Sequence, residues 1–408
     1  MSGNVPAIRF AGFTEPWEQR KLGDVAEIVG GGTPDTNNVD YWDGVIDWYS
    51  PAELGTQIYV DGSARRITEA GYANSSAKML PAERTILFTS RAGIGTAAIL
   101  RRPACTNQGF QSIVVGDEAD VYFLFSMTDH IKKCAEQKAA GSTFLEVSGK
   151  QLAAIDLKLP ALSEQRKIGS LFQSLDSLIT LHQRKHDQLA TLKKSLLEKM
   201  FPKPGSDIPE LRFAGFTEPW EQRKLGDIAT KVTKKNSDLA IQETFTNSAE
   251  RGVVSQLDYF DHDITNDDNL GNYIVVEPDD FVYNPRISVA APVGPINRNC
   301  LFRAGVMSPL YTVFRVNATV DHSYLEHYFN TSLWHAFMNL EGNSGARSDR
   351  FSISDSTFFE MPISCPRKDE QSAIAVLLER FDSLITLHQR KHDQFATLKK
   401  SLLDKMFV

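Results

Sequence analysis

The stretch DSLITLHQRKHDQLATLKKSLLEKMF occupies residues 176–201, and DSLITLHQRKHDQFATLKKSLLDKMF occupies residues 382–407. The two copies differ only at Leu189/Phe395 and at Glu198/Asp404. Because nearly every residue type is kept, we infer that one chain performs the same structural task twice.

Each copy has the pattern of a long helix with an apolar stripe. Counted from Ile168 as position a, the a positions are Ile168, Leu175, His182, Leu189 and Leu196, the d positions are Leu171, Leu178, Lys185, Leu192 and Lys199, and Phe172, Ile179 and Met200 widen the stripe at e. Apolar heptads predict helices that pack side by side, so we expect the two helices to pack on each other. A helix of ~38 residues is roughly 57 Å long.

Two histidine pairs interrupt the stripe, His182/His186 and His388/His392, each with i, i+4 spacing. That spacing can hold a metal ion. The alternative is a polar layer that fixes the register of the two helices, as buried polar residues do in coiled coils. We favour the polar layer and predict no metal site.

A second segment, RFAGFTEPWEQRKLGD, also occurs twice, at 9–24 and 212–227. The chain is therefore a tandem duplication in which unlike modules alternate with shared segments, and a period of about 200 residues is too long for a solenoid unit. The predicted parts are a first domain at 1–162, a first long helix at 163–201, a linker at 202–211, a second domain at 212–368 and a second long helix at 369–408.

The unlike modules have the pattern of mixed α/β domains. Short runs rich in β-branched and aromatic residues, separated by Gly and Pro, predict strands at 84–90, 97–100, 111–115, 272–285 and 309–316. Helical patterns follow at 121–138 and 322–339. The predicted fold class is α/β (α+β), with two such domains and an internal repeat.

Composition is that of a globular protein with more than one domain: 408 residues, 42% hydrophobic and 23% charged. No apolar run approaches the ~18 residues of a membrane helix, and the first residues lack the pattern of a secretory signal. We therefore expect a cytoplasmic protein that does not bind membranes. The four cysteines are widely spaced, which favours buried free thiols in a reducing compartment.

The net charge of −7 argues against a chain that binds DNA without help, because such proteins usually carry a basic excess. A local basic face can still lie on an acidic protein. If the chain binds DNA, we expect a partner to neutralise part of the phosphate charge.

No set of catalytic residues stands out in the sequence. Residues 93–98 fit G-x-G-x-x-A, so a nucleotide-dependent enzyme is one alternative. Pro103 follows too soon for the helix that such a site requires, and a glycine hairpin is favoured. The pattern indicates a binding or organising protein, and a coiled-coil adaptor that binds only proteins is a further alternative.

Taken together, the chain resembles the specificity (S) subunit of type I restriction–modification systems. The resemblance rests on EPWEQRKLGD in both halves, on GGGTP followed by YWDGVIDWYS, on ITEAGYANSSAKMLPAERTILFTSRAGIGTAAI and CTNQGFQSIVV, and on the P-x-x-x-EQ entry into each long helix. In the second module YNPRISVAAPVG stands where SRAGIGTAA would be.

The resemblance implies two target-recognition domains separated by two long antiparallel helices. Each domain would read one half of a gapped site in double-stranded DNA, and helices of ~57 Å would limit the site to roughly 17 base pairs. The helices would dock two methyltransferase (M) subunits, which bind S-adenosylmethionine. Restriction (R) subunits, which use ATP and Mg, would join the complex. The S subunit itself would catalyse nothing and hold no cofactor.

Arg, Asn and Gln side chains on loops are the expected readers of base edges. The candidate DNA-binding residues of the first module are Ser90, Arg91, Gly93, Gly95, Thr106, Asn107, Gln108, Gln111, Ser142 and Thr143. Those of the second module are Asn284, Arg286, Arg298, Asn299, Arg347, Ser348 and Arg350, with Lys231, Lys234 and Lys235 as phosphate contacts. Arg91 and Arg286 are the strongest of these candidates, because an arginine recurs at this place in two otherwise divergent modules.

Overall fold

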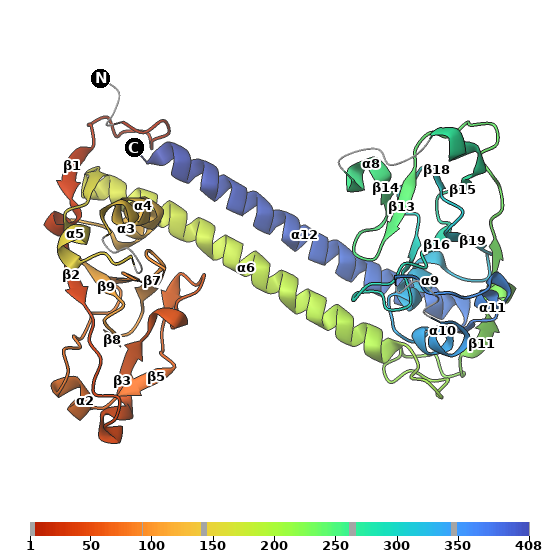
Figure 1. Cartoon of the computed structure of the whole chain (residues 1–408), viewed down its shortest axis with the longest axis horizontal. Helices are drawn as coiled ribbons and strands as arrows, with labels where there is room; N and C mark the ends of the chain where they lie inside the picture. The colour runs from red at the N-terminus through yellow and green to blue at the C-terminus, as the bar shows by residue number, and fades with distance from the viewer. Residues whose placement is uncertain (1–4, 92, 140–144, 261–266, 344–348, 408) are drawn as a thin grey trace. The chain divides into compact units, whose positions relative to one another are not determined.

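The computed structural model describes residues 5–91, 93–139, 145–260, 267–343 and 349–407. It divides into two compact units, of which unit 1 comprises residues 1–183 and 390–408 and unit 2 comprises residues 184–389. Figure 1 labels the helices and strands. Both long helices, α6 (Leu162–Met200) and α12 (Lys368–Met406), contribute residues to each unit.

Unit 1 is built on a five-stranded sheet with strand order β2-β9-β6-β7-β4. Its strands are β2 (Ala26–Gly30), β4 (Tyr59–Val60), β6 (Thr85–Phe88), β7 (Ala97–Leu100) and β9 (Gln111–Val115). A three-stranded sheet contains β3 (Trp42–Tyr49), β5 (Arg65–Ile67) and β8 (Cys105–Thr106), and β1 (Glu18–Lys21) pairs with β10 (Asp156–Leu159). The short helices are η1 (Val39–Tyr41), η2 (Pro51–Glu53), α1 (Leu22–Val25), α2 (Glu69–Ala73), α3 (Val121–Ser126), α4 (Thr128–Lys138) and α5 (Gly149–Ala153).

Unit 2 contains a four-stranded sheet with strand order β12-β19-β16-β17. These strands are β12 (Ala229–Lys231), β16 (Phe281–Tyr283), β17 (Ile296–Arg298) and β19 (Thr312–Val316). Three two-stranded sheets pair β11 (Glu221–Lys224) with β20 (Pro362–Cys365), β13 (Phe245–Ser248) with β14 (Gly252–Ser255), and β15 (Ile274–Val276) with β18 (Gly305–Met307). The short helices are α7 (Leu225–Ile228), α8 (Gln256–Tyr259), η3 (Asp267–Asn272), α9 (His322–Phe329), α10 (His335–Glu341) and α11 (Asp355–Phe359).

The mixed α/β class and the predicted strands are confirmed. The runs at 84–90, 97–100 and 111–115 form β6, β7 and β9, and the runs at 272–285 and 309–316 contain β15, β16 and β19. Each predicted helical pattern is divided in two, into α3 and α4 and into α9 and α10. All four residues of β6 are buried, which accounts for its continuous apolar run.

The shared segments fasten each domain to its long helix. In unit 1 the Arg9 guanidinium donates two hydrogen bonds of 2.7 Å to the buried Glu164 carboxylate at the start of α6. In unit 2 Arg212 donates the same two bonds to Glu370 of α12. The arginines come from the repeated segment RFAGFTEPWEQRKLGD and the glutamates from the P-x-x-x-EQ entry into each long helix, so this contact gives a physical reason why both sequences occur twice.

The residue after each glutamate makes a second link. The Gln165 Oε1 atom accepts a hydrogen bond of 3.1 Å from the backbone N–H of Asp120, which caps α3. The Gln371 Oε1 atom accepts one of 2.9 Å from the backbone N–H of Asp321, which caps α9. The glutamine of each P-x-x-x-EQ sequence thus connects a long helix to the N-terminus of the short helix α3 or α9.

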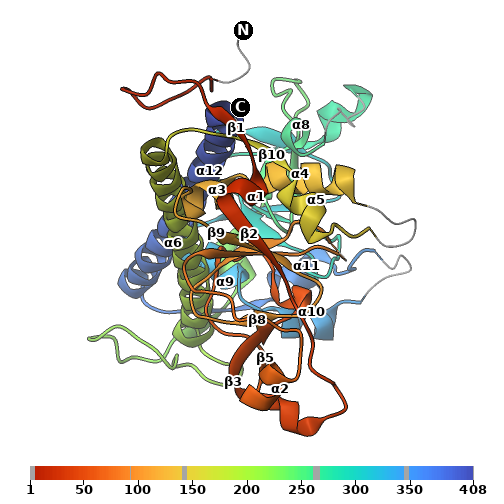
Figure 2. The same ribbon diagram turned by 90° about the vertical axis from the view of Figure 1, so that its left-hand side faces the viewer.

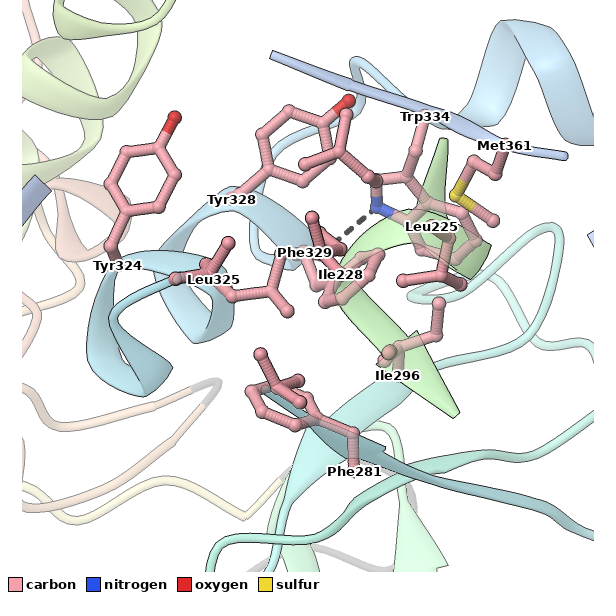
Figure 3. Packing of buried hydrophobic residues seen from close by; sticks show 14 of the residues in the cluster. Leu225, Ile228, Phe281, Ile296, Tyr324, Leu325, Tyr328, Phe329, Trp334 and Met361 are labelled. Atoms are coloured by element: carbon pink, nitrogen blue, oxygen red, sulfur yellow. Dashed lines mark hydrogen bonds between the residues drawn. The ribbon is translucent and has the colours of Figure 1, made fainter. Parts of the chain in front are cut away.

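The end of a long helix completes each core. In unit 1 the Phe407 ring lies 6.2 Å from Trp17 and 5.7 Å from Phe172, and Figure 2 shows this end of α12 beside β1. In unit 2 the Phe201 ring packs 5.5 Å from Tyr324. Figure 3 shows the neighbouring core of unit 2, where the Trp334 indole N–H donates a hydrogen bond of 3.1 Å to the Phe329 carbonyl.

Ion pairs join the two long helices at equivalent positions of the repeat. In unit 1 the Lys399 ammonium lies 2.7 Å from the Asp176 carboxylate, and in unit 2 Lys193 lies 2.5 Å from Asp382. His182 stacks on Phe395 with ring centroids 5.6 Å apart. Residue numbers therefore rise along α6 as they fall along α12, so within unit 1 the two helices run in opposite directions.

The inward face of α6 differs from the predicted a/d stripe. Leu178 and Leu192, predicted at d, are 36% and 49% exposed, whereas Phe172 and Leu175, at e and a, are buried. Positions a and e are also four and three residues apart in turn, so they form an apolar stripe of their own. The same sequence is therefore compatible with two different inward faces of the helix. The prediction that d-position leucines face inward is wrong for Leu178 and Leu192, whereas Leu171, also at d, packs against the core of unit 1.

Other predictions concern metals, thiols and membranes. Within the described ranges no group of three or more His, Cys, Asp or Glu side chains could hold a metal ion. The four cysteines are free thiols. Cys105 and Cys365 are buried, as predicted, whereas Cys134 is half-buried and Cys300 is exposed. Over the same ranges no helix is long and apolar enough to span a membrane.

Candidate nucleic-acid interface

In unit 1 the glycine-rich stretch forms the loop of an antiparallel hairpin between β6 and β7. Gly93 and Gly95 have φ angles of +112° and +92°, which favour glycine. A Cβ atom on Gly95 would lie 2.5 Å from the Lys132 Cγ atom. The Thr89 hydroxyl closes the loop by donating a hydrogen bond of 2.6 Å to the Gly93 carbonyl. Because a strand and not a helix follows, the dinucleotide-site alternative is wrong.

Arg91 lies at the start of this loop, next to the segment that precedes α5. It forms an isolated antiparallel bridge with Glu146, and the Val147 N–H donates a hydrogen bond of 3.0 Å to the Ser90 carbonyl. Residues paired in this way direct their side chains to the same side. Neither the Arg91 nor the Glu146 side chain forms an ion pair or hydrogen bond with another described residue. Ser90 itself is buried, so its side chain faces the interior.

The second polar loop of unit 1 is only partly available to a ligand. Thr106 is buried in β8, and the Asn107 side chain accepts a hydrogen bond of 2.8 Å from the Gly109 N–H, which shapes the turn. Gln108 is exposed, and its side chain accepts a hydrogen bond from the Thr33 hydroxyl. Gln111 is half-buried on β9. Gln108 is thus the residue of this loop that best presents an amide to solvent.

In unit 2 Arg286 occupies the position that Arg91 has in unit 1. Arg286 forms an isolated antiparallel bridge with Arg350, and the Phe351 N–H donates a hydrogen bond of 2.8 Å to the Pro285 carbonyl. Like charges directly opposite each other on paired strands are destabilising. Among the described residues neither arginine has an ion-pair or side-chain hydrogen-bond partner. The guanidinium groups of Arg286 and Arg350 thus lie on the same side of one bridge, and no carboxylate of the described residues pairs with either of them.

The Arg286/Arg350 pair lines a cleft of about 520 Å³. Asn284 lies in its wall and donates a hydrogen bond of 2.8 Å to the Asn247 carbonyl. The Gln256 Oε1 atom, also in the wall, is buried and has no hydrogen-bond partner within the described part of the chain. The residues that line this cleft thus include cationic and amide side chains, the residue types that contact phosphates and base edges.

The three lysines predicted as phosphate contacts are exposed at the end of β12 and directly after it. Lys231 forms an ion pair with Asp355, and the Lys234 ammonium is 3.9 Å from Glu277. Lys235 makes a long hydrogen bond of 3.5 Å to Asn272. Exposed ion pairs of this kind are weak, so these lysines can exchange a carboxylate for a phosphate.

Arg298 and Asn299 have partners inside unit 2. The Arg298 guanidinium donates hydrogen bonds of 2.8 Å to Glu326 and 3.2 Å to Asp279. Burial raises the pKa of the Glu326 carboxyl, and Arg298 acts in the opposite direction. Asn299 is buried and its amide donates to the carbonyls of Glu277 and Arg303. These contacts occupy the groups that a base would need, so we leave both residues out of the interface.

Four predicted residues, Ser142, Thr143, Arg347 and Ser348, lie outside the described residues. Glu146 and Gln256 are not among the residues predicted from the sequence. Nothing in the sequence pairs residue 146 with residue 91, because the bridge joins segments that are far apart in the chain. Gln256 carries no motif, and only its buried, unpaired oxygen distinguishes it.

Comparison with known proteins adds independent information. Residues 14–191 match the family model of the type I restriction modification DNA specificity domain. The chain is 31% identical to the type I restriction enzyme MjaIX specificity subunit of Methanocaldococcus jannaschii, over 54% of this chain and 53% of the relative. It is 28% identical to the EcoR124I/EcoR124II specificity subunit of Escherichia coli, over 46% and 49%. The chain thus spans about half the length of these two relatives.

Two further matches cover nearly the whole chain. The putative type I restriction enzyme MjaX specificity subunit of M. jannaschii is 24% identical over 99% of this chain and 96% of the relative. The crystal structure of the S subunit of a type I restriction–modification system from M. genitalium superimposes with a TM-score of 0.56, at 13% identity and 99% coverage of each chain, which is a likeness of fold. The matched family is a DNA specificity domain and not a catalytic one. By these matches the chain is similar to specificity subunits of type I restriction–modification systems, and its residues 14–191 match a DNA specificity domain of such systems.

Proposed function

We propose that this chain selects a bipartite, gapped sequence in double-stranded DNA, with one target-recognition domain in each unit reading one half. The observation that carries the proposal is the arginine at the same backbone bridge in both units, Arg91 opposite Glu146 and Arg286 opposite Arg350. Arginine is the commonest specific reader of guanine. The partner residues differ in charge, which fits two domains that read different sequences.

We also propose that the internal repeat makes the two long helices an antiparallel spacer between the domains. The Asp176–Lys399 and Lys193–Asp382 ion pairs support this, because each joins one copy of the repeat to the other. Repeated contacts of this kind would hold the helix register and with it the spacing between the half-sites.

Exposed leucines of the two long helices occur at equivalent positions in both units and offer a surface for protein partners. Unit 1 exposes Leu178 and Leu181 of α6 and Leu398 of α12, while unit 2 exposes Leu384 and Leu387 of α12 and Leu192 of α6. The three residues of α12 are the repeat equivalents of the three of α6. Exposed apolar patches mark interaction sites, and a patch present twice supports docking of two methyltransferase subunits.

The catalytic groups of the assembly would belong to its partners. We propose that the methyltransferase subunits supply S-adenosylmethionine chemistry, that restriction subunits supply ATP- and Mg-dependent chemistry, and that this chain is non-catalytic. Its substrate, DNA, would place it in the cytoplasm. The net charge of −7 supports a subunit that shares its grip on phosphates with others.

Methylation mapping tests the proposal. The chain would be co-expressed with its methyltransferase partner in a host free of DNA methylation, and the genome sequenced for modified bases. We expect a gapped motif, and replacing residues 25–146 by those of another specificity subunit should change one half only. A motif that changes in both halves, or an unmodified genome despite an assembled complex, would contradict the two-domain proposal.

A further inference from the structure

We infer that Glu146 determines a base within the half-site read by unit 1, by accepting a hydrogen bond from the N4 amino group of cytosine. This inference rests on the proposed function and names a residue that reads sequence beside Arg91. It depends on the placement of Glu146, on its carboxylate having no partner among the described residues, and on the charge at the equivalent place in unit 2.

Backbone contacts hold Glu146 in place beside Arg91, on the surface of unit 1 that we propose contacts DNA. Its bridge to Arg91 is held by the Val147–Ser90 hydrogen bond of 3.0 Å, and Val147 is buried. The Ser148 side chain accepts a hydrogen bond from the Gln151 N–H and caps α5 directly afterwards. Glu146 is therefore an exposed side chain on a fixed backbone, beside Arg91 and on the same side of the bridge.

A carboxylate in this position has few favourable partners on DNA. It is repelled by phosphates and by the acceptor atoms O6 and N7 of guanine. Cytosine presents an N4 amino donor in the major groove, and Glu or Asp accepting from that group is a recognised base contact. Because guanine pairs with cytosine, an arginine and a glutamate side by side match the two edges of C·G base pairs.

The equivalent place in unit 2 carries the opposite charge. Arg350 lies opposite Arg286, and no described carboxylate pairs with either arginine. Two arginines fit guanines or phosphates but not the cytosine amino group. The residue opposite the shared arginine therefore differs in charge between the two domains, and so does the DNA group that each domain can bind there.

Selection from a duplex library with a randomised first half-site tests the inference. The probe would be bound by the full chain in complex with its methyltransferase partner, and bound duplexes sequenced. We expect the wild type to require cytosine at one position that Glu146→Ala relaxes, with about tenfold loss of discrimination there. Glu146→Gln should admit adenine at that position, because glutamine bonds adenine N6 and N7. Glu136→Gln, an exposed carboxylate of α4, is the matched control and should change nothing.

The outcomes separate the inference from the proposed function. If Arg91→Ala weakens selection of the first half-site but both Glu146 variants keep every base preference, the inference is wrong and the proposed function stands. If Arg91→Ala also leaves selection of the first half-site unchanged, the surface of unit 1 around Arg91 does not read DNA. Thermal unfolding of each variant shows whether it is folded, and an exposed position such as residue 146 should not alter it.

Discussion

The Glu164 carboxylate accepts two hydrogen bonds from the Arg9 guanidinium, both 2.7 Å long, and is fully buried. Removing one partner of a buried ion pair leaves an uncompensated charge and costs about 3–5 kcal/mol. We expect Arg9→Ala to lower the free energy of unfolding of unit 1 by about that amount, measured by hydrogen exchange in unit 1. The double variant Arg9→Met/Glu164→Leu should recover much of the loss. Equal stability of Arg9→Ala and the wild type would show that the pair is dispensable.

The two interhelix ion pairs should differ in strength. Asp176 is buried and also accepts a hydrogen bond of 2.8 Å from the Tyr122 hydroxyl, whereas the Asp382 side chain is 47% exposed. We therefore expect Lys399→Ala to destabilise the protein by more than Lys193→Ala, with the exposed pair worth under about 1 kcal/mol. Urea unfolding of the two single variants compares them directly. A larger effect of Lys193→Ala would contradict the assignment.

His327 should make unit 2 sensitive to acid. Burial lowers the pKa of His327 to about 4, and neither ring nitrogen has a hydrogen-bond partner among the residues described. The unfolded chain gains a proton near pH 6.5 and the folded chain only near pH 4, so stability is full above pH 6.5 and is lost as the pH falls between these values. The loss should reach about 3 kcal/mol, since one pKa unit is worth ~1.4 kcal/mol.

Urea unfolding at pH 7, 5.5 and 4.5 measures this loss. The His327→Leu variant, which cannot take up a proton at this position, is the control and should show a flatter pH dependence. An identical pH profile for variant and wild type would mean that other groups cause the acid sensitivity.

Base-reading and phosphate-binding residues should respond differently to salt and sequence. We expect Lys234→Ala to weaken binding to all duplexes alike and to reduce the salt slope by about 1, because each phosphate contact releases a counterion. Arg286→Ala should lose about 1–3 kcal/mol only on duplexes with the cognate second half-site. Binding titrations at several salt concentrations, on cognate and scrambled half-sites, distinguish the two. If Lys234→Ala discriminates between sequences, its assignment to phosphate is wrong.

The exposed leucines should control how many partner subunits bind. Leu178→Glu with Leu181→Glu alters the patch of unit 1, and Leu384→Glu with Leu387→Glu alters that of unit 2. We expect each double variant to retain one methyltransferase subunit in place of two, measured by native mass spectrometry of the co-expressed complex. The exposed Leu340 belongs to α10 and not to either long helix, and Leu340→Glu should leave the stoichiometry unchanged. Two bound partners in every variant would exclude these patches as docking sites.

Much of the fold was predictable because it depends on local pattern. The strand runs contain β-branched and aromatic residues between glycines and prolines, and β6, β7 and β9 form at the predicted places. The long helices also formed as predicted. The inward face of α6 was not predictable, because Leu175 and Leu178 are the same residue type and only the packed neighbours make one buried and the other exposed.

The candidate site was predictable in part: Arg91, Asn284, Arg286 and Arg350 are predicted from the sequence, whereas Glu146 and Gln256 are not. Arg91 and Arg286 stand out because arginine recurs in two divergent modules. The sequence gives no such signal for Glu146, because its role depends on a backbone bridge to Arg91, which lies far from it along the chain. Arg298 was a reasonable loop candidate, but Glu326 and Asp279 occupy its guanidinium in the folded protein.

The sequence by itself determined that the chain is duplicated, that its modules are mixed α/β and that two long amphipathic helices join them. These features are local, because strand propensity, helical periodicity and repetition are properties of neighbouring residues. Only the tertiary structure decided that Glu164 is the partner of Arg9 and that Glu146 lies opposite Arg91. Such pairs form when folding brings distant segments together, and neither residue's identity nor its neighbours encode the partner.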